Sequence, residues 1–378
     1  MKLLVYVPLL TPRIKYIFNF IFNDILKTQV GFSSNLAEFK GSALPKISYG
    51  NMPVSDELFF KNSDFLLSHN ITPPNIKTTT FGDMLVPFAV DNSSLPFDVF
   101  AASFYFVSRY EEYLPYEPNQ EGNFPADLSL QSKLKLLEFP VIDGWALMLK
   151  NILLKRYPNL YFGKKSFQFI PLVCLYPTRE TGSAQFLKKA FQLFSNISLP
   201  FSGKRKSASL NKMGGLQLFL REQHEKYNLE GVYFSRPAQE INSICDREIA
   251  FPKSYLQLIK SGIGKDYRMG YSNTIGFRAG TCTPFFWYDL QLEKTTHLLV
   301  HSVAVNDLIL KQQRTFDIDA VLSKWGRLIE NVKLLNGDFY ILWHKETLPE
   351  FGKGKVGRRL YTQLLGNFLS LPNDIRLE

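Results

Sequence analysis

The run FQFIPLVCLY at residues 167–176 constrains the fold more than any other part of the sequence. It carries no charged residue, and Gln168 is its one strongly polar side chain. Strands of this composition are typically buried on both faces, in a parallel sheet or barrel that helices cover. The run therefore predicts an α/β arrangement around a central strand.

Amphipathic helices and short apolar strands alternate on both sides of this run. The spacing of apolar residues predicts helices over 11–27, 97–113, 141–157, 184–194, 216–227, 251–261, 317–335 and 358–368. It predicts further strands over 3–7, 30–32, 45–49, 231–234 and 339–343. Residues 51–94 are interrupted by Pro and Asn, which indicates short strands mixed with loops. This alternation is typical of an α/β protein.

The chain of 378 residues is long enough for two domains of ordinary size. The Lys164–Lys165 pair, after the helix over 141–157, marks the boundary. We therefore predict an N-terminal α/β domain over 1–165 and a barrel-like α/β domain over 166–378.

Charge is distributed unevenly between these domains. The net charge is +10, yet residues 1–165 hold 16 Lys and Arg against 15 Asp and Glu, while the remainder holds 28 against 19. The second domain could therefore attract an anionic partner. No Lys/Arg block is long enough for a nucleic-acid-binding arm, so we expect no nucleic-acid partner.

Cysteine usage and the N-terminus indicate where the protein works. Cysteines at 174, 245 and 282 are too few and too irregularly spaced for a disulfide scaffold or a zinc knuckle, so we expect reduced thiols. The apolar N-terminal run is broken by Pro8 and Pro12 and fits a first strand better than a signal peptide. No segment has the ~18–20 apolar residues of a membrane span. We expect a cytoplasmic protein without a transmembrane segment.

Chemically unusual residues are densest between Tyr255 and His301. This stretch holds Asp266, a Gly-rich turn over 276–280 with Arg278 at its centre, and a strand that ends on His301. Arg278 is expected to cap that turn through backbone carbonyls. His301 is either a site residue or an ordinary residue at a strand end.

Two adjacent carboxylates, Glu111 and Glu112, follow Arg109 near the end of the helix predicted over 97–113. Adjacent residues on a helix point in different directions, so the two are not expected to act as a catalytic pair. We expect all three charged side chains to face water.

Several segments resemble one known family. They are TPRIKYIFNFIF at 11–22, LPKISYGNMPVSDELFF at 44–60, LPFDVFAASFYFVSRYEEYLPYE at 95–117, DYRMGYSNTIGFRAGTCTPFFWYDL at 266–290 and LWHKETLPEFG at 342–352. In these segments the chain resembles the two-domain polysaccharide deacetylase family proteins of Bacteroidetes-type bacteria. The resemblance implies an N-terminal accessory domain of unassigned role. It also implies a C-terminal domain of the carbohydrate-esterase type, built on a distorted (β/α) barrel.

The resemblance also implies a chemistry. In that family an Asp and two His hold a divalent metal such as zinc, a second Asp is the base, and a late His is the acid. A metal-bound water then becomes a nucleophile near neutral pH, and an N- or O-acetyl group is removed from a glycan.

The metal-binding half of this set is missing from the sequence. The family's two acidic positions fall at Cys174 and Tyr176, and no His occurs between Glu225 and Thr296. The position of the family's Arg falls near 243–245, where Arg247 is out of place. The barrel is therefore expected to be incomplete and to lack the usual metal site.

Other family positions are retained. His301 matches the late Leu-x-x-His motif, and with Arg278 and Asp266 it forms the candidate catalytic set. The aromatic residues that follow could stack against a carbohydrate substrate. They are Phe286, Trp287 and Tyr288. His344 and Asp289 are weak candidates for a metal ligand.

Three functions follow, in this order of preference. The first is a deacetylase-like pseudoenzyme that binds a glycan or a partner and needs no cofactor. The second is an active glycan deacetylase whose divalent metal, such as zinc, is held by His301, His344 and either Asp266 or Asp289. The third is an assembly factor in surface-polysaccharide production that acts through residues 1–165. In each case the expected partner is a carbohydrate or a glycan precursor.

Overall fold

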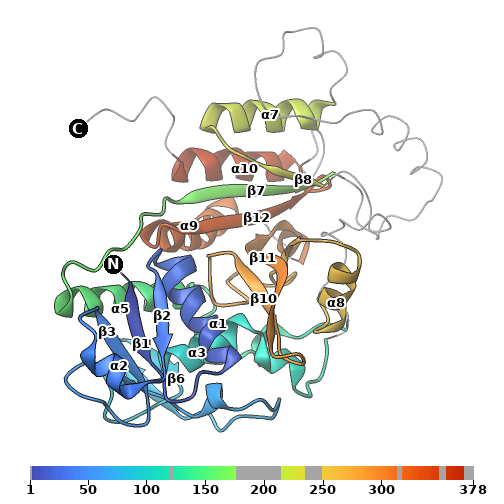
Figure 1. Cartoon of the computed structure of the whole chain (residues 1–378). Helices are drawn as coiled ribbons and strands as arrows, with labels where there is room; N and C mark the ends of the chain where they lie inside the picture. Colours follow the sequence, from blue (N-terminus) through green and yellow to red (C-terminus); the bar gives the residue numbers. More distant parts are fainter. Residues whose placement is uncertain are drawn as a thin grey trace.

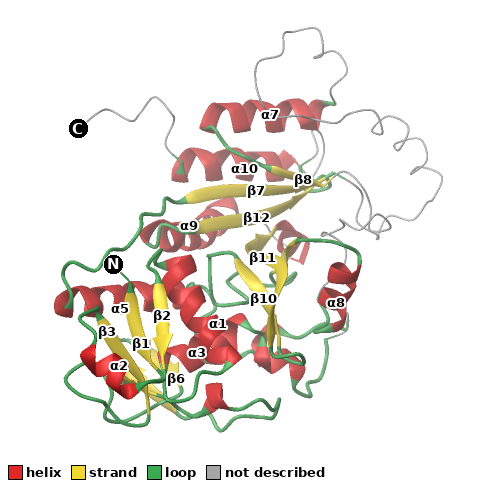
Figure 2. Ribbon diagram, in the orientation of Figure 1, coloured by secondary structure: helices red, strands yellow, loops and turns green. Residues whose placement is uncertain are grey.

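The computed structural model describes residues 2–119, 122–175, 214–234, 249–312, 317–348 and 355–369. These residues form two sheets built mainly of parallel strands, together with a small hairpin and the helices that cover them (Figures 1 and 2). The prediction of a mixed α/β fold is confirmed. The helix predicted over 184–194 lies outside the described residues. Within the described residues, no helix is both long and apolar enough to cross a membrane.

The first sheet lies in the N-terminal part and has four parallel strands. Their order is β2 (Val30–Ser33), β1 (Leu3–Tyr6), β3 (Lys46–Gly50) and β4 (Leu58–Lys61). The associated helices are α1 (Pro12–Asn19) with its π-helical continuation η1 (Phe20–Ile25), α2 (Leu36–Gly41), α3 (Val99–Val107) and α5 (Val141–Arg156). The Thr11 hydroxyl accepts a hydrogen bond from the backbone N–H of Ile14, and Pro12 occupies the first turn. Both features favour the start of a helix here, so the local sequence defines the beginning of α1.

Short elements fill residues 51–94, as expected, and further short elements precede α5. They are the 3₁₀ turn η2 (Phe65–Leu67), the antiparallel hairpin of β5 (Thr78–Phe81) and β6 (Met84–Pro87), η3 (Tyr110–Tyr113), η4 (Ala126–Leu128) and α4 (Leu130–Lys133). The helix predicted over 97–113 is interrupted because Arg109 adopts a left-handed backbone, with φ of 55°. This ends α3 and starts the turn η3.

The second sheet contains the central strand that the apolar run predicts. The order is β10 (Phe285–Asp289), β11 (Lys294–Asn306), β12 (Asp338–His344), β7 (Gln168–Cys174) and β8 (Val232–Phe234), and β9 (Lys265–Met269) also pairs with β11. The strands are parallel except for the antiparallel pair β10–β11. Further elements are α7 (Gly215–Tyr227), α8 (Lys253–Lys260), η6 (Asp307–Gln312), α9 (Ile318–Leu334) and α10 (Lys355–Phe368).

Strand β7 is buried on both faces, which confirms the prediction for this run. Phe169 and Val173 join the core under α7, α9 and α10, while Leu172 and Cys174 join a smaller cluster on the opposite face. Figure 1 shows α7 and α10 lying along β7 and β12. The face opposite these helices is called the inner face below.

One hydrophobic core joins the two sheets. Helix α1 and η1 contact β10 directly: the rings of Tyr16 and Tyr288 lie 4.9 Å apart, and those of Phe20 and Phe285 lie 6.1 Å apart. The first sheet lies before residue 165 and the second lies after it, so the predicted boundary separates the sheets. The shared core means that the hairpin β10–β11 is packed as part of the N-terminal core.

This packing predicts very different effects for two neighbouring aromatic residues on β10. Trp287 is 1% exposed and Phe286 is 44% exposed. Trp287→Ala is expected to lower the free energy of unfolding by about 3–5 kcal/mol through lost burial and a cavity. Phe286→Ala, the matched control, should lower it by under about 1 kcal/mol. Urea unfolding measures both, and similar losses in the two variants would contradict the shared core.

Candidate functional site

His301 lies in a cup of aromatic side chains on the inner face of the second sheet. Its ring stacks on Tyr267 of β9, with ring centres 4.2 Å apart and planes 10° apart. The ring of Tyr340, on β12, lies edge-on at 5.1 Å. The ring of Phe234, on β8, is tilted against that of Tyr267, with ring centres 6.0 Å apart. These four residues are called the His301 cup.

One ring nitrogen of His301 is hydrogen-bonded, and the other is buried without a hydrogen-bond partner among the described residues. Nδ1 lies 2.9 Å from the Tyr340 hydroxyl, whereas Nε2 has no hydrogen-bond partner among the described residues. The Tyr340 hydroxyl donates to Asp338 at 3.3 Å, so it can accept a hydrogen bond from Nδ1–H. In this arrangement the buried, unpaired Nε2 carries a lone pair.

The His301 ring is neutral at pH 7. Burial, helped by the nearby charge of Lys265 and opposed by that of Asp266, lowers the pKa of His301 to about 4. A neutral imidazole whose lone pair has no partner can accept a hydrogen bond from a hydroxyl or an amide. Such a nitrogen is also a common metal ligand. The His301 cup therefore combines one polar nitrogen atom with surrounding aromatic rings.

Asp266, the neighbouring candidate, is committed to a structural pair. It is fully buried, its Oδ1 accepts a hydrogen bond from Arg268 Nε at 2.6 Å, and its Oδ2 accepts one from the Tyr255 hydroxyl at 3.0 Å. The backbone N–H of Arg268 also donates to Oδ2, at 3.2 Å. This carboxylate is balanced by a charge and held by three donors.

The two weak metal candidates are also held by structural partners. His344 Nδ1 lies 2.5 Å from Asp307 Oδ1, and both groups are fully buried. Asp289 accepts hydrogen bonds from the backbone N–H groups of Gln291 and Leu292, which closes the turn between β10 and β11. In the described part of the chain, no three His, Cys, Asp or Glu side chains converge as a metal site would require.

Two of the three cysteines lie in the described residues. Cys174 is disulfide-bonded, so the expectation of a reduced thiol is wrong for it. Cys282 is a free and buried thiol. Tyr176, Cys245 and Arg247 lie outside the described residues.

Arg278 is neither exposed nor a cap of its own turn. Its guanidinium binds both carboxylate oxygens of Glu112, at 2.9 and 2.6 Å, and donates to the Gly270 carbonyl at 3.1 Å. Arg109 Nε donates to the same Glu112 at 2.8 Å, and its Nη2 donates to Glu111 at 2.9 Å. These four charged residues are called the Arg–Glu cluster.

The expectation that Arg109, Glu111 and Glu112 face water is therefore wrong. Both arginines are fully buried, and Glu112 is 3% exposed. The left-handed backbone at Arg109 starts the turn η3, in which Glu112 reaches Arg278 and Glu111 binds Arg109 and the backbone N–H of Leu130. Two positive and two negative charges balance there, as buried ions require.

The Gly-rich turn itself is clamped by N-terminal residues. Gly276 has φ of 127°, and a Cβ there would lie 2.4 Å from the Leu137 carbonyl oxygen, so the turn requires glycine. Asp143 of α5 accepts hydrogen bonds from the hydroxyls of Thr281 and Thr283 and from the backbone N–H of Cys282. Through these contacts, residues 276–283 join the second part of the chain to the N-terminal part.

The three aromatic residues proposed as a stacking platform do not share a surface. Trp287 and Tyr288 are each 1% exposed, and Phe286 alone of the three reaches the surface. Trp287 packs on Tyr255 of α8, whereas Tyr288 packs on Tyr16 of α1, so each ring is covered by a neighbouring helix. The prediction of a platform is wrong for Trp287 and Tyr288.

The residues that do surround His301 were missed from the sequence. Tyr340 shares its face of β12 with Leu342, and the period of two along residues 339–343 could have indicated this. Tyr267 lies on the short strand β9, next to Asp266. Its stacking on His301 depends on the pairing of β9 with β11, which no local pattern specifies.

The Arg–Glu cluster predicts a large effect of Glu112→Gln. Removing this charge leaves two buried guanidinium groups short of a carboxylate, so the free energy of unfolding should fall by about 3–5 kcal/mol. Glu117→Gln, at an exposed position of the same segment, should change it by under about 0.5 kcal/mol.

The same substitution has a pH signature. Burial opposes ionisation of Glu112, but the charges of Arg278 and Arg109 outweigh it and hold its pKa below the ordinary 4.5. The stabilisation is therefore complete above pH 4.5 and is lost as the pH falls further. The gap between wild type and Glu112→Gln should narrow in urea unfolding below that pH. A gap that stays constant would contradict the buried ion pairs.

The burial of His301 predicts a second dependence of folding stability on pH. The unfolded chain takes up a proton on this residue near pH 6.5, whereas the folded chain does so near pH 4, so folding loses stability as the pH falls between these values. His301→Phe should make the stability curve shallower in this range. His297→Phe, at an exposed position of the same strand, should leave it unchanged. Equal curves for wild type and His301→Phe would contradict the burial of His301.

Comparison with known proteins identifies one family. Residues 3–158 match the family described as "Family of unknown function (DUF7033)". The matched part covers the first sheet and the helices around it, and it ends before β7. No curated protein and no solved structure matches the chain. The first part of the chain is therefore similar to a family whose description assigns no activity, and the match does not reach the His301 cup.

Proposed function

We propose that the chain is a polysaccharide deacetylase-like protein that binds an acetylated glycan at the His301 cup and does not hydrolyse it by the usual metal-dependent route. The segments that resemble the deacetylase family support this proposal. So does the run of parallel strands β8, β7, β12 and β11, which is compatible with a distorted and incomplete (β/α) barrel.

The observation that carries the proposal is the buried Nε2 of His301, which lies among aromatic rings and has no hydrogen-bond partner among the described residues. A sugar with an N-acetyl group has hydroxyl and amide donors at its edges and apolar C–H groups on its faces. The donors fit a neutral imidazole lone pair, and the apolar face fits Tyr267, which is half-buried. Ligand sites commonly combine an apolar wall with a few placed polar groups in this way.

The remaining candidate residues favour binding over hydrolysis. Water activation by the family's route needs several ligands around one metal and a separate carboxylate base. Asp266 is held by Arg268 and Tyr255, and Asp289 holds a turn. His344 is paired with Asp307. Asp266 and Asp289 would have to leave these partners before they could bind a metal beside His301, which is unfavourable, and no three potential ligands converge among the described residues.

Titration calorimetry with N-acetylated chitotetraose tests the proposal. His301→Ala and Tyr267→Ala should each weaken binding at least about tenfold, or about 1.4 kcal/mol, because they remove the polar contact and the stacking wall. His297→Ala is the matched control and should bind as wild type does, since His297 is an exposed histidine on the same strand.

Two results would overturn the proposal. The first is no binding of the oligosaccharide, or binding that neither cup variant weakens. The second is acetate release with added zinc, abolished by His301→Ala, which would make the chain an active deacetylase with an atypical site.

A further inference from the structure

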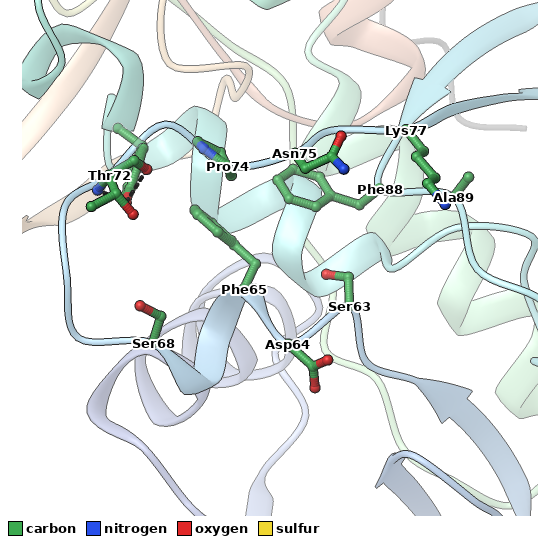
Figure 3. A pocket seen from close by; sticks show the side chains of 11 residues that line it. Ser63, Asp64, Phe65, Ser68, Thr72, Pro74, Asn75, Lys77, Phe88 and Ala89 are labelled. Atoms are coloured by element: carbon green, nitrogen blue, oxygen red, sulfur yellow. Dashed lines mark hydrogen bonds between the residues drawn. The ribbon is translucent and has the colours of Figure 1, made fainter.

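A separate cavity of about 390 Å³ opens in the N-terminal part. It lies between η2, the loop that leads to β5, and the residues that follow β6 (Figure 3). Its volume falls in the range of small-ligand pockets, about 300–1,000 Å³. It lies within the residues that match the family of unknown function, apart from the His301 cup.

The lining of this cavity is held in an unusual backbone conformation. Asp64 and Phe88 both line it, and both have left-handed backbones, with φ of 64° and 63°. A bulky residue such as Phe rarely adopts this conformation, and such strain is concentrated at functional sites. The buried Asp98 holds both segments: its backbone N–H donates to the Phe88 carbonyl, and its carboxylate accepts from Ser63. The cavity is therefore shaped before any ligand enters.

Aromatic rings form one wall of the cavity. The rings of Phe65 and Phe88 lie 5.0 Å apart, and the ring of Tyr110 lies edge-on to Phe65 at 4.9 Å. Figure 3 shows Phe65 and Phe88 between Pro74 and Asn75 on one side and Ser63 on the other. The buried guanidinium of Arg13 contacts the rings of both Phe65 and Tyr110 and so supports this wall.

Polar groups complete the lining. A carboxylate, an amide and an ammonium group come from Asp64, Asn75 and Lys77, which are exposed. Within the described residues these side chains enter no ion pair, so they are available to a ligand. One negative and one positive charge cancel, which disfavours both a strongly anionic ligand and a cation. The combination suits a neutral ligand with hydroxyl groups at its edges and an apolar face.

We propose that this cavity binds a neutral saccharide of one or two rings. The ring face contacts the aromatic wall, while the hydroxyl groups bond to Asp64, Asn75 and Lys77. This site would give the N-terminal part a binding function of its own. It does not depend on glycan binding at the His301 cup.

Saturation-transfer NMR on the full chain tests this proposal with four probes: glucose, galactose, N-acetylglucosamine and N,N′-diacetylchitobiose. Asp64→Gly removes the carboxylate and places at this position the residue that tolerates a left-handed backbone best. It should weaken binding at least about tenfold without lowering Tm. Lys77→Met should weaken binding similarly, and Lys155→Ala, an exposed lysine of the same part, should have no effect.

The Tyr267→Ala variant separates this site from the His301 cup, since it should keep the signals that Asp64→Gly removes. The proposal is overturned if none of the four saccharides receives magnetisation at millimolar concentration. It is also overturned if their binding is unchanged in both Asp64→Gly and Lys77→Met, or if glycine and alanine bind there and the saccharides do not.

Discussion

The ion pairs of Glu112 with Arg278 and Arg109 hold this structure together. Arg109 comes from the end of α3 and Arg278 from a turn far along the chain, and both donate to one buried carboxylate. Buried charges are tolerated when they are balanced and fully hydrogen-bonded, and losing one partner is strongly unfavourable. The cluster thus fixes where the Gly-rich turn sits against the N-terminal core. Strand β10, which follows that turn, is then placed to share the core.

In this arrangement the segment that joins the two parts, residues 276–283, is distinct from the strand that carries His301 and is proposed to bind a ligand. The stretch over 276–283 resembles a catalytic motif in its residue types, but its polar groups meet N-terminal partners, including Asp143. His301 lies further along the chain, on the inner face, and its buried Nε2 has no hydrogen-bond partner among the described residues. Its neighbours are aromatic rings instead of carboxylates. This difference is why we propose that the site holds a sugar and does not activate water.

Much of the fold could be predicted from the sequence, because apolar periodicity reports burial directly. The run over 167–176 indicated a strand buried on both faces, and Thr11 with Pro12 indicated the start of α1. The site could be predicted less well, because its parts depend on contacts between distant residues. The burial of Glu112 needs a left-handed Arg109 and a partner 166 residues away. Tyr288 is buried against Tyr16 and Phe104, which are distant in the sequence, so alternation along β10 could not reveal its burial.

The most direct measurement of the central claim is a crystal structure of the chain grown with N-acetylated chitotetraose and zinc, with data collected at the zinc absorption edge. The account predicts a sugar ring against Tyr267 with one of its donors on His301 Nε2, and no anomalous peak on that nitrogen. A zinc ion bound to His301 Nε2 and to two further side chains of the chain would contradict it.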